Sequence, residues 1–179
     1  DKPIPLSNVL PMLENLGLSI VSERPYELEF TNEERLWIQD FDMIPVVDRE
    51  LNLESIRPLF QEAFQKAIKG EVDSDRFNQL IIAAELDWRQ VKVIRGYCKY
   101  LLQIGTPFSQ SYMAETLAKF PPISRLLLEL FEAMFDPERE EESSYRKQQA
   151  VRQLERSMQT LLPETFSQDD VLAEYLEEV

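Results

Sequence analysis

The chain has 179 residues and is strongly acidic, because 19 lysines and arginines stand against 33 aspartates and glutamates, a net charge of −14. Binding to nucleic acid depends on clustered Lys and Arg, so this charge argues against a nucleic-acid-binding protein. The sequence has no histidine, which removes the commonest general base, the imidazole-based catalytic triads and the usual zinc and non-haem iron sites. Its single cysteine, Cys98, excludes an intramolecular disulfide and is typical of a reducing compartment.

Glycine is scarce, and its spacing fits no phosphate-binding loop. Gly17, Gly70, Gly96 and Gly105 match neither the GxGxxG nor the GxxxxGK[ST] pattern. Hydrophobic residues make up 44% of the sequence, enough for a packed core in one domain or two small ones. No stretch approaches the roughly 18 apolar residues of a membrane span, and no signal peptide follows Asp1. We therefore expect an acidic globular chain that lacks most catalytic machinery, and its start suggests a piece of a longer protein.

The N-terminal part of the chain combines one helical pattern with two strand patterns. Residues 7–16 have apolar side chains at helical spacing, with Gly17 placed to end the helix and Pro11 expected in its first turn. Residues 18–30 and 35–43 alternate between apolar and polar side chains, as strands do. The sequence therefore predicts a helix followed by two strands that pair antiparallel.

Strand patterns disappear after Leu51, and short helices separated by Pro and Gly follow. Ser55 is predicted to cap a helix over residues 56–69, with Pro58 in its first turn and Gly70 at its end. Further helix starts are predicted at Asp73, at Asp87 with Gln90 in a capping box, at Ser109, and after Pro121 and Pro122. Such a series predicts a bundle of antiparallel helices.

Asp136-Pro137 and the acidic run from Glu138 to Glu142, read as a solvated helix start, mark a predicted boundary. A charged helix follows, with an apolar repeat that begins at Val151 and is too short for a coiled coil. A last helix is predicted from Ser167, and its apolar face is unfinished at Val179, as expected at the end of a fragment.

The predicted fold class is α+β, mostly α, with a small antiparallel β segment at the N-terminus and a multi-helix bundle behind it. We predict three parts, namely residues 1–48 with the helix and both strands, residues 49–137 as the helical bundle, and residues 138–179 as the charged helix and the terminal helix.

Two acidic groups could in principle bind a cation. Asp40 and Asp42 lie two residues apart in a strand, so both carboxylates share a face and could share a proton or a metal ion. We favour the alternative of ordinary surface carboxylates. Glu71, Asp73 and Asp75 lack the glycine and the bidentate glutamate of a calcium loop, so capping of the following helix is the better interpretation.

Cys98 has no histidine to act as its base, so we interpret it as a structural thiol. One helix also carries a predicted basic strip opposite its apolar face, formed by Arg89, Lys92, Arg95 and Lys99. The strip could bind an anion or an acidic partner, but pairing within the chain is the favoured interpretation. Trp37, Trp88 and the phenylalanines are predicted to belong to the core. No catalytic, cofactor-binding or metal-binding residue is assigned.

Long motifs in three stretches of the chain resemble the large bacterial NAD-specific glutamate dehydrogenases. They are LPMLENLGLSIVSERPYEL with WIQDF (Leu10 to Leu28 and Trp37 to Phe41), RFNQLIIAAELDWRQVKVIRGYCKYLLQIGTPFSQSYMAETLAKFP (Arg76 to Pro121) and LLLELFEAMFDP (Leu126 to Pro137). The resemblance implies a region upstream of the dehydrogenase domain, so no catalytic residue of the family has a counterpart here. The start of the chain is similar to part of an ACT module, whose full pattern is βαββαβ, and residues 1–48 are therefore expected to form a partial ACT-like αββ segment.

For the full enzyme, the resemblance implies oxidative deamination of L-glutamate to 2-oxoglutarate and ammonia, with NAD as hydride acceptor, in a cytoplasmic homo-oligomer. This region is expected to be regulatory or structural, inactive alone and without NAD, with the rest of the same polypeptide and other subunits as partners. No nucleic acid or membrane is expected to bind. Two alternatives stay open: an allosteric module that binds an amino acid at the junction of sheet and helices, and a freestanding acidic helical interaction protein.

Overall fold

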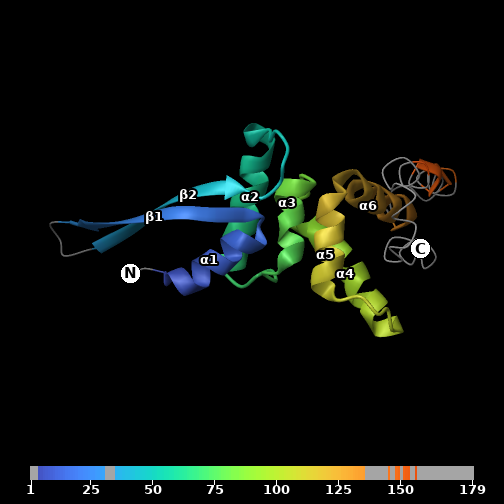
Figure 1. Ribbon diagram of the computed structural model, residues 1–179, viewed down its shortest axis with the longest axis horizontal. Helices are drawn as coiled ribbons and strands as arrows, with labels where there is room; N and C mark the ends of the chain where they lie inside the picture. The colour runs from blue at the N-terminus through green and yellow to red at the C-terminus, as the bar shows by residue number, and fades with distance from the viewer. Residues whose placement is uncertain are drawn as a thin grey trace. The chain divides into compact units, whose positions relative to one another are not determined.

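The computed structural model describes residues 4–30 and 35–135, together with residues 145, 148, 149, 151–153 and 156. In chain order the elements are α1 (Leu6–Asn15), β1 (Leu18–Glu29), β2 (Arg35–Pro45), α2 (Leu53–Ile68), a 3₁₀ turn η1 (Arg76–Gln79), α3 (Leu80–Ala83), α4 (Trp88–Ile104), α5 (Gln110–Lys119) and α6 (Pro121–Phe135), as Figure 1 shows. The predicted α+β fold, mostly helical with a small antiparallel sheet at the N-terminus, is confirmed.

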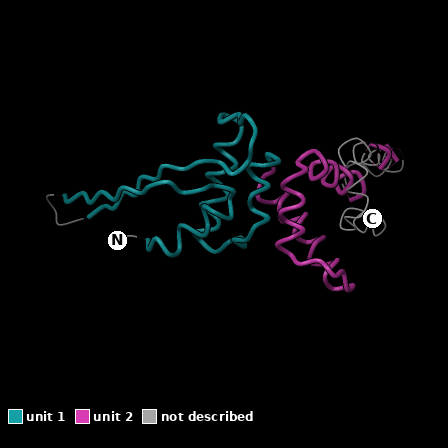
Figure 2. Tube along the Cα trace, viewed as in Figure 1, with its two compact units in different colours: residues 1–85 teal, residues 86–179 magenta. Residues whose placement is uncertain are grey.

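The chain forms two compact units, unit 1 over residues 1–85 and unit 2 over residues 86–179, coloured separately in Figure 2. Unit 1 thus groups α2 and α3 with the hairpin. The predicted domain boundaries after residues 48 and 137 stay predictions. The acidic run from Glu138 to Glu142 and the last predicted helix from Ser167 lie outside the described residues, as does most of the apolar repeat that begins at Val151.

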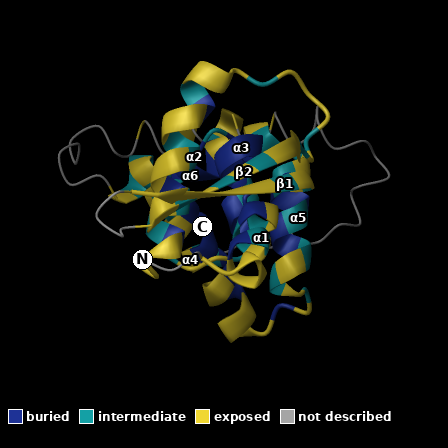
Figure 3. Cartoon of the chain, turned by 90° about the vertical axis from the view of Figure 1, so that its left-hand side faces the viewer, coloured by how far each residue is buried: buried dark blue, intermediate teal, exposed yellow. Residues whose placement is uncertain are grey.

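β1 and β2 form a long antiparallel hairpin, which confirms the predicted strand pair. The pairing runs from Leu18 opposite Pro45 to Glu29 opposite Arg35, with a bulge between Ile20 and Ser22. Because the sheet has two strands, both strands are edges, where a proline such as Pro25 is tolerated. The distal part of the hairpin projects beyond the helices of unit 1 in Figure 1. Its residues are mostly exposed, as Figure 3 shows in yellow.

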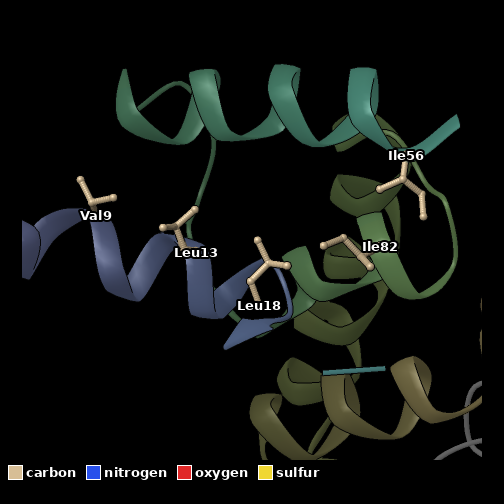
Figure 4. Packing of buried hydrophobic residues seen from close by; sticks show 5 residues of the cluster. All are labelled: Val9, Leu13, Leu18, Ile56 and Ile82. Carbon is tan, nitrogen blue, oxygen red and sulfur yellow. The ribbon is translucent and has the colours of Figure 1, made fainter. Parts of the chain in front are cut away.

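The core of unit 1 joins the base of the hairpin to three helices. Its buried members come from α1, β1, α2 and α3 and follow one another along the space between these elements in Figure 4; they are Val9, Leu13, Leu18, Ile56 and Ile82. Burying a side chain of this size contributes about 1.5–3 kcal/mol, so each element gains its stability from the others. Gly17 makes the turn between α1 and β1 possible, because its φ is +84° and a Cβ there would lie 3.3 Å from the Cβ of Gln79.

The structure corrects the expected positions of two prolines. Pro11 and Pro58 were expected in first turns, but both lie inside their helices, α1 and α2. Each therefore removes an N–H that would bond the carbonyl four residues earlier, on Ser7 or Glu54. These two residues are exposed, so water can hydrate the orphaned carbonyls.

Asn52, rather than the predicted Ser55, caps α2. The helix begins at Leu53, earlier than expected, and the side-chain oxygen of Asn52 accepts a hydrogen bond from the N–H of Glu54 at 3.1 Å. Ser55 lies inside the first turn, where its hydroxyl donates to the carbonyl of Asn52 at 3.0 Å.

A polar network centred on Arg49 fixes the loop between β2 and α2. Nη2 of Arg49 donates to the carbonyls of Ile82 and Ala83, at 3.1 and 3.2 Å, and to Oε1 of Glu85 at 3.3 Å. The other carboxylate oxygen of Glu85 accepts from the Ser55 hydroxyl at 3.3 Å. Glu85 has a φ of +55°, which a residue with a Cβ rarely adopts, so these contacts hold a strained backbone in place.

In the continuously described part of unit 2, residues 86–135, the helices are α4, α5 and α6, each of which contacts the other two. The predicted capping box is confirmed: Oδ1 of Asp87 accepts from the N–H of Gln90 at 2.9 Å, and Oε1 of Gln90 accepts from the N–H of Asp87 at 2.9 Å. The predicted cap of α5 by Ser109 is also confirmed. Pro121 and Pro122, expected to precede a helix, instead form its first two residues, where a missing N–H costs little.

Gly105 and Gly96 provide a matched pair for testing the end of α4. Gly105 has a φ of +100°, whereas Gly96 lies inside α4, and a Cβ would meet open space at both positions. Gly105→Ala should therefore destabilise the chain by about 1 kcal/mol through backbone strain alone. Gly96→Ala should stabilise it by about 0.5–1 kcal/mol. Urea denaturation followed by circular dichroism measures both, and equal effects would contradict the described end of α4.

The Arg49 network can be tested by its removal. Arg49→Met removes the donor that Oε1 of Glu85 shares with the carbonyls of Ile82 and Ala83, so we expect a loss of about 1–2 kcal/mol in the free energy of unfolding. The control is Arg35→Met, because Arg35 bridges Glu27 and Glu29 on the exposed hairpin and should contribute at most about 0.5 kcal/mol. A double-mutant cycle with Glu85→Gln measures the coupling, and a zero coupling energy would show that the pair does not act together.

Candidate functional site

A groove with a volume of about 770 Å³ opens at the base of the hairpin in unit 1. Ten of its thirteen lining residues are apolar, and they come from the hairpin, the loop after β2, and helices α2 and α3. Leu18, Ile56 and Ile82 belong to the buried cluster in Figure 4, so the floor of the groove is the core of the unit. The walls include Leu51 and Phe60, which pack against that cluster. A concave, mostly apolar surface of this volume is typical of small-molecule sites.

Three charged residues line the groove, namely Asp48, Arg49 and Arg57. Arg49 is held by the carbonyls of α3 and by Glu85, as described above. Arg57 is exposed on α2, and its side chain makes no ion pair or hydrogen bond within the described part of the chain. The groove therefore offers one available guanidinium beside an apolar surface, in a chain whose net charge is negative.

The structure places Asp40 and Asp42 on one face of β2, as predicted, and gives them a structural role. Both pair with Arg24 on β1, whose Nε lies 3.4 Å from Oδ2 of Asp40 and whose Nη2 lies 2.8 Å from Oδ2 of Asp42. Ser22 also donates to Asp42 at 2.7 Å. The carboxylates thus stabilise cross-strand pairing, which supports the surface interpretation over a cation site.

The second acidic group also serves the local structure. Asp75 caps η1 by accepting a hydrogen bond from the N–H of Phe77 at 3.1 Å, as the capping interpretation predicts. Glu71 accepts from Nζ of Lys66 at 2.8 Å, and this ion pair lowers the pKa of the Glu71 carboxyl. Within the described residues, no three His, Cys, Asp or Glu side chains are grouped so that they could hold a metal ion.

The predicted basic strip on α4 is wrong in one position, because Arg95 is 5% exposed. Arg95 follows Val91 by four residues and precedes Cys98 by three, so helical geometry places it on the buried face. Arg89, Lys92 and Lys99 are exposed, and the guanidinium of Arg89 lies 4.3 Å from the centre of the Trp88 ring. The remaining cations are thus too few and too scattered to form a built anion site.

Cys98 is fully buried, which confirms the structural interpretation of its thiol. Burial raises the pKa of the Tyr97 hydroxyl, and its ring packs edge-on against Phe131 with centroids 5.9 Å apart.

The aromatic residues were expected in the core, and this holds for only some of them. Phe77 is fully buried, but Trp37 and Trp88 are only partly buried, and Phe30 is 52% exposed. Trp37 belongs to the projecting part of β2 and Phe30 follows the end of β1, and neither is a member of the buried cluster of unit 1.

The outer face of the hairpin carries an apolar surface that sequence reasoning did not single out. It consists of two cross-strand pairs, Tyr26 with Ile38 and Leu28 with Leu36, here called the hairpin patch. Each of these four side chains is between 43 and 48% exposed. The alternating pattern of both strands contained this signal, but alternation alone does not tell whether an apolar face meets a partner inside the chain. Exposed apolar side chains gathered on one face are typical of interaction surfaces.

The described residues of the chain do not fit a dinucleotide. Gly17, Gly70 and Gly105 each follow a helix with a positive φ, and Gly96 lies within α4, so their backbone freedom serves helix ends rather than a phosphate loop. The described sheet is antiparallel and lacks the parallel strand crossover of a dinucleotide site. No helix in the described residues has both the length and the apolar character needed to cross a membrane.

Comparison with known families divides the chain into two matches. Residues 1–56 match the family described as "Glutamate dehydrogenase, ACT3 domain". Residues 72–137 match the family described as "Glutamate dehydrogenase, helical motif 3". The first match covers α1, the hairpin and the start of α2, and the second runs from η1 through α6.

Curated relatives named NAD-specific glutamate dehydrogenase resemble most of the chain. The protein of Halomonas elongata is 46% identical over 98% of this chain, that of Pseudomonas aeruginosa 38% over 75%, and that of Mycobacterium tuberculosis 37% over 82%. The chain spans only 11%, 8% and 9% of the lengths of these relatives. Both family matches follow one another along the chain, and the similarity to the Halomonas elongata protein extends over nearly the whole length of this chain. This chain therefore belongs to the NAD-specific glutamate dehydrogenase family, and it corresponds to a small part of the length of these relatives.

Proposed function

We propose that the chain is a non-catalytic, regulatory or structural region of an NAD-dependent glutamate dehydrogenase. The observation that carries this proposal is the coverage of the Halomonas elongata relative, which is similar to 98% of this chain while the chain spans 11% of its length. Two features of the described residues agree with it, namely that no three His, Cys, Asp or Glu side chains are grouped to hold a metal ion and that the glycines with a positive φ follow helices. In this proposal NAD and the reacting groups belong to another part of the enzyme.

The whole enzyme would oxidise L-glutamate to 2-oxoglutarate and ammonia, with NAD as hydride acceptor, in a cytoplasmic homo-oligomer. The partners of this region would be the rest of the same polypeptide and the other subunits. The hairpin patch supports this role, because covering its four apolar side chains would stabilise contact with a further domain. An effector would act by shifting the population between arrangements of such contacts.

A second candidate function is a module that binds an amino acid at the junction of sheet and helices. The groove at the base of the hairpin favours it, because the groove lies at that junction and combines apolar walls with Asp48 and Arg57. Calorimetric titration with a panel of amino acids tests this candidate, and saturable heat for one of them would distinguish it from a pure scaffold. The comparisons give no support to a freestanding acidic interaction protein.

The proposed non-catalytic role, here called the scaffold role, predicts that the isolated chain and a chimaeric enzyme that contains it differ in activity. The 179-residue chain alone should form no NADH from glutamate and NAD in a spectrophotometric assay. The Halomonas elongata enzyme in which this chain replaces the matching segment should retain most of its activity, because the segment supplies contacts rather than chemistry. Activity of the isolated chain, or an inactive chimaera that is folded and assembled, would contradict the proposal.

The hairpin patch predicts a second difference in the same chimaera. Leu28→Lys with Ile38→Lys should change the unfolding free energy of the isolated chain by no more than about 1 kcal/mol, because both side chains are already half exposed. In the chimaera the same pair should reduce the assembled, active fraction several-fold, measured by sedimentation velocity and NADH formation.

The control for this test adds the same two charges away from the patch, as Ser19→Lys with Gln61→Lys, at two exposed positions of unit 1. It should leave the activity and the sedimentation coefficient of the chimaera unchanged. A chimaera that tolerates the patch variant as well as the control would show that the patch makes no essential contact.

A further inference from the structure

We propose that the groove at the base of the hairpin binds a small molecule with an apolar body and a single carboxylate, which Arg57 anchors. This inference sharpens the second candidate function, since it assigns the groove a ligand class, and it does not depend on the scaffold role. Nothing in the family descriptions or in the names of the relatives assigns a ligand to this groove.

The walls of the groove specify an apolar ligand body. Phe60 and Leu51 are only partly buried against the core, and Leu53 is 62% exposed at the rim, so apolar surface stays in contact with water. Covering such surface releases about 25 cal/mol for each Å² of apolar area. The volume of about 770 Å³ lies within the range of small-molecule sites, so the open groove has room for a ligand of modest size.

The charges of the groove specify an anion. Arg49 lies in the wall, but its Nη2 already donates to two carbonyls and to Glu85, so its charge is compensated within the protein. Arg57 has no such partner in the described part of the chain and lies on α2 one residue after Ile56, which forms part of the floor. A guanidinium binds carboxylate and phosphate groups through two parallel hydrogen bonds, and of the two a carboxylate carries the single negative charge that one arginine compensates.

The negative charge of the chain and the single available guanidinium of the groove together disfavour ligands with several negative charges. In a chain of net charge −14, an anion is repelled by most of the surface, so an anion site needs a local cation and an apolar contribution to binding. A nucleic acid or another polyanion would meet one available guanidinium and would not be held. A ligand with one negative charge and a sizeable apolar part satisfies both requirements.

Asp48 lines the same groove and distinguishes two kinds of ligand that carry an apolar body and a carboxylate. A simple carboxylic acid would use Arg57 alone, whereas an apolar amino acid would add an ammonium group that Asp48 could bind. The two sources share the anchor and the apolar body, so one set of probes can distinguish them.

The experiment titrates the 179-residue chain with four probes of one chain length: octanoate, 2-aminooctanoate, octanol and octylamine. Isothermal calorimetry gives the affinity and the stoichiometry. We expect saturable binding of one octanoate or 2-aminooctanoate per chain, roughly tenfold tighter than octanol, which corresponds to one charge-assisted contact. Tighter binding of 2-aminooctanoate than of octanoate identifies an amino acid as the source, and the reverse order identifies a carboxylic acid.

Two variants locate the site. Arg57→Gln should weaken octanoate binding to the level of octanol, because it removes the charge and leaves the apolar walls intact. Leu53→Glu should abolish octanoate binding, because it places a carboxylate at the rim of the groove. Leu53 is the first residue of α2, where an acidic side chain is favourable, so this variant should fold. Circular dichroism checks the fold of both.

The matched control is Arg89→Gln, which removes an exposed arginine on α4 in unit 2 and should leave octanoate affinity unchanged. Equal affinities for octanoate, octanol and octylamine would overturn the proposal, as would octanoate binding that survives Arg57→Gln or an absence of saturable binding. None of these results bears on the scaffold role, which the chimaera tests independently.

Discussion

The packing around Leu18, the first residue of β1, is the contact on which the rest of unit 1 depends. Leu18 joins Val9 and Leu13 of α1, Ile56 of α2 and Ile82 of α3 in one buried cluster. A two-stranded hairpin is at best marginally stable by itself, so the base of β1 and β2 must be fixed from outside. The cluster supplies this support at one end of the hairpin only. The distal part therefore depends on cross-strand contacts, such as those of Arg24 with Asp40 and Asp42 and of Arg35 with Glu27 and Glu29.

The same cluster forms the floor of the groove, so the stability of the unit and the shape of its site have one origin. The loop from Val46 to Asn52 forms one wall, and Arg49 fixes this loop to the last carbonyls of α3. Arg49 thereby compensates its own charge and holds Glu85 in a left-handed conformation. The side chain of Arg57 has no such bonding partner in the described residues, although it lines the same groove. The two arginines illustrate how one residue type serves structure where it is bonded and becomes available for a ligand where it is not.

The sequence predicted features that depend on local chemistry, such as the capping box of Asp87 and Gln90 and the antiparallel pairing of the strands. It was wrong about Ser55, because Asn52 three residues earlier offers a competing cap, and local pattern does not decide between them. It was also wrong about Arg95, although the spacing from Val91 and to Cys98 indicated a buried face. The groove could not be predicted, since its walls come from β2, α2 and α3 and meet only after folding. The hairpin patch was visible as alternation, but its exposure depends on the absence of a covering element among the described residues.

The exposed hairpin patch and the negative charge of the chain are both consistent with a surface that a specific partner covers. A net charge of −14 makes nonspecific association between copies unfavourable, so apolar surface can stay exposed with less risk of aggregation. On the same face as the patch, Arg24 is paired with Asp40 and Asp42 of the hairpin itself, whereas Arg35 with Glu27 and Glu29 lies on the opposite face. A partner that covers the patch would not need to separate these ion pairs, because they already satisfy one another across the strands. Burial of the four apolar side chains would then contribute to docking with little electrostatic cost, as the proposed structural role requires.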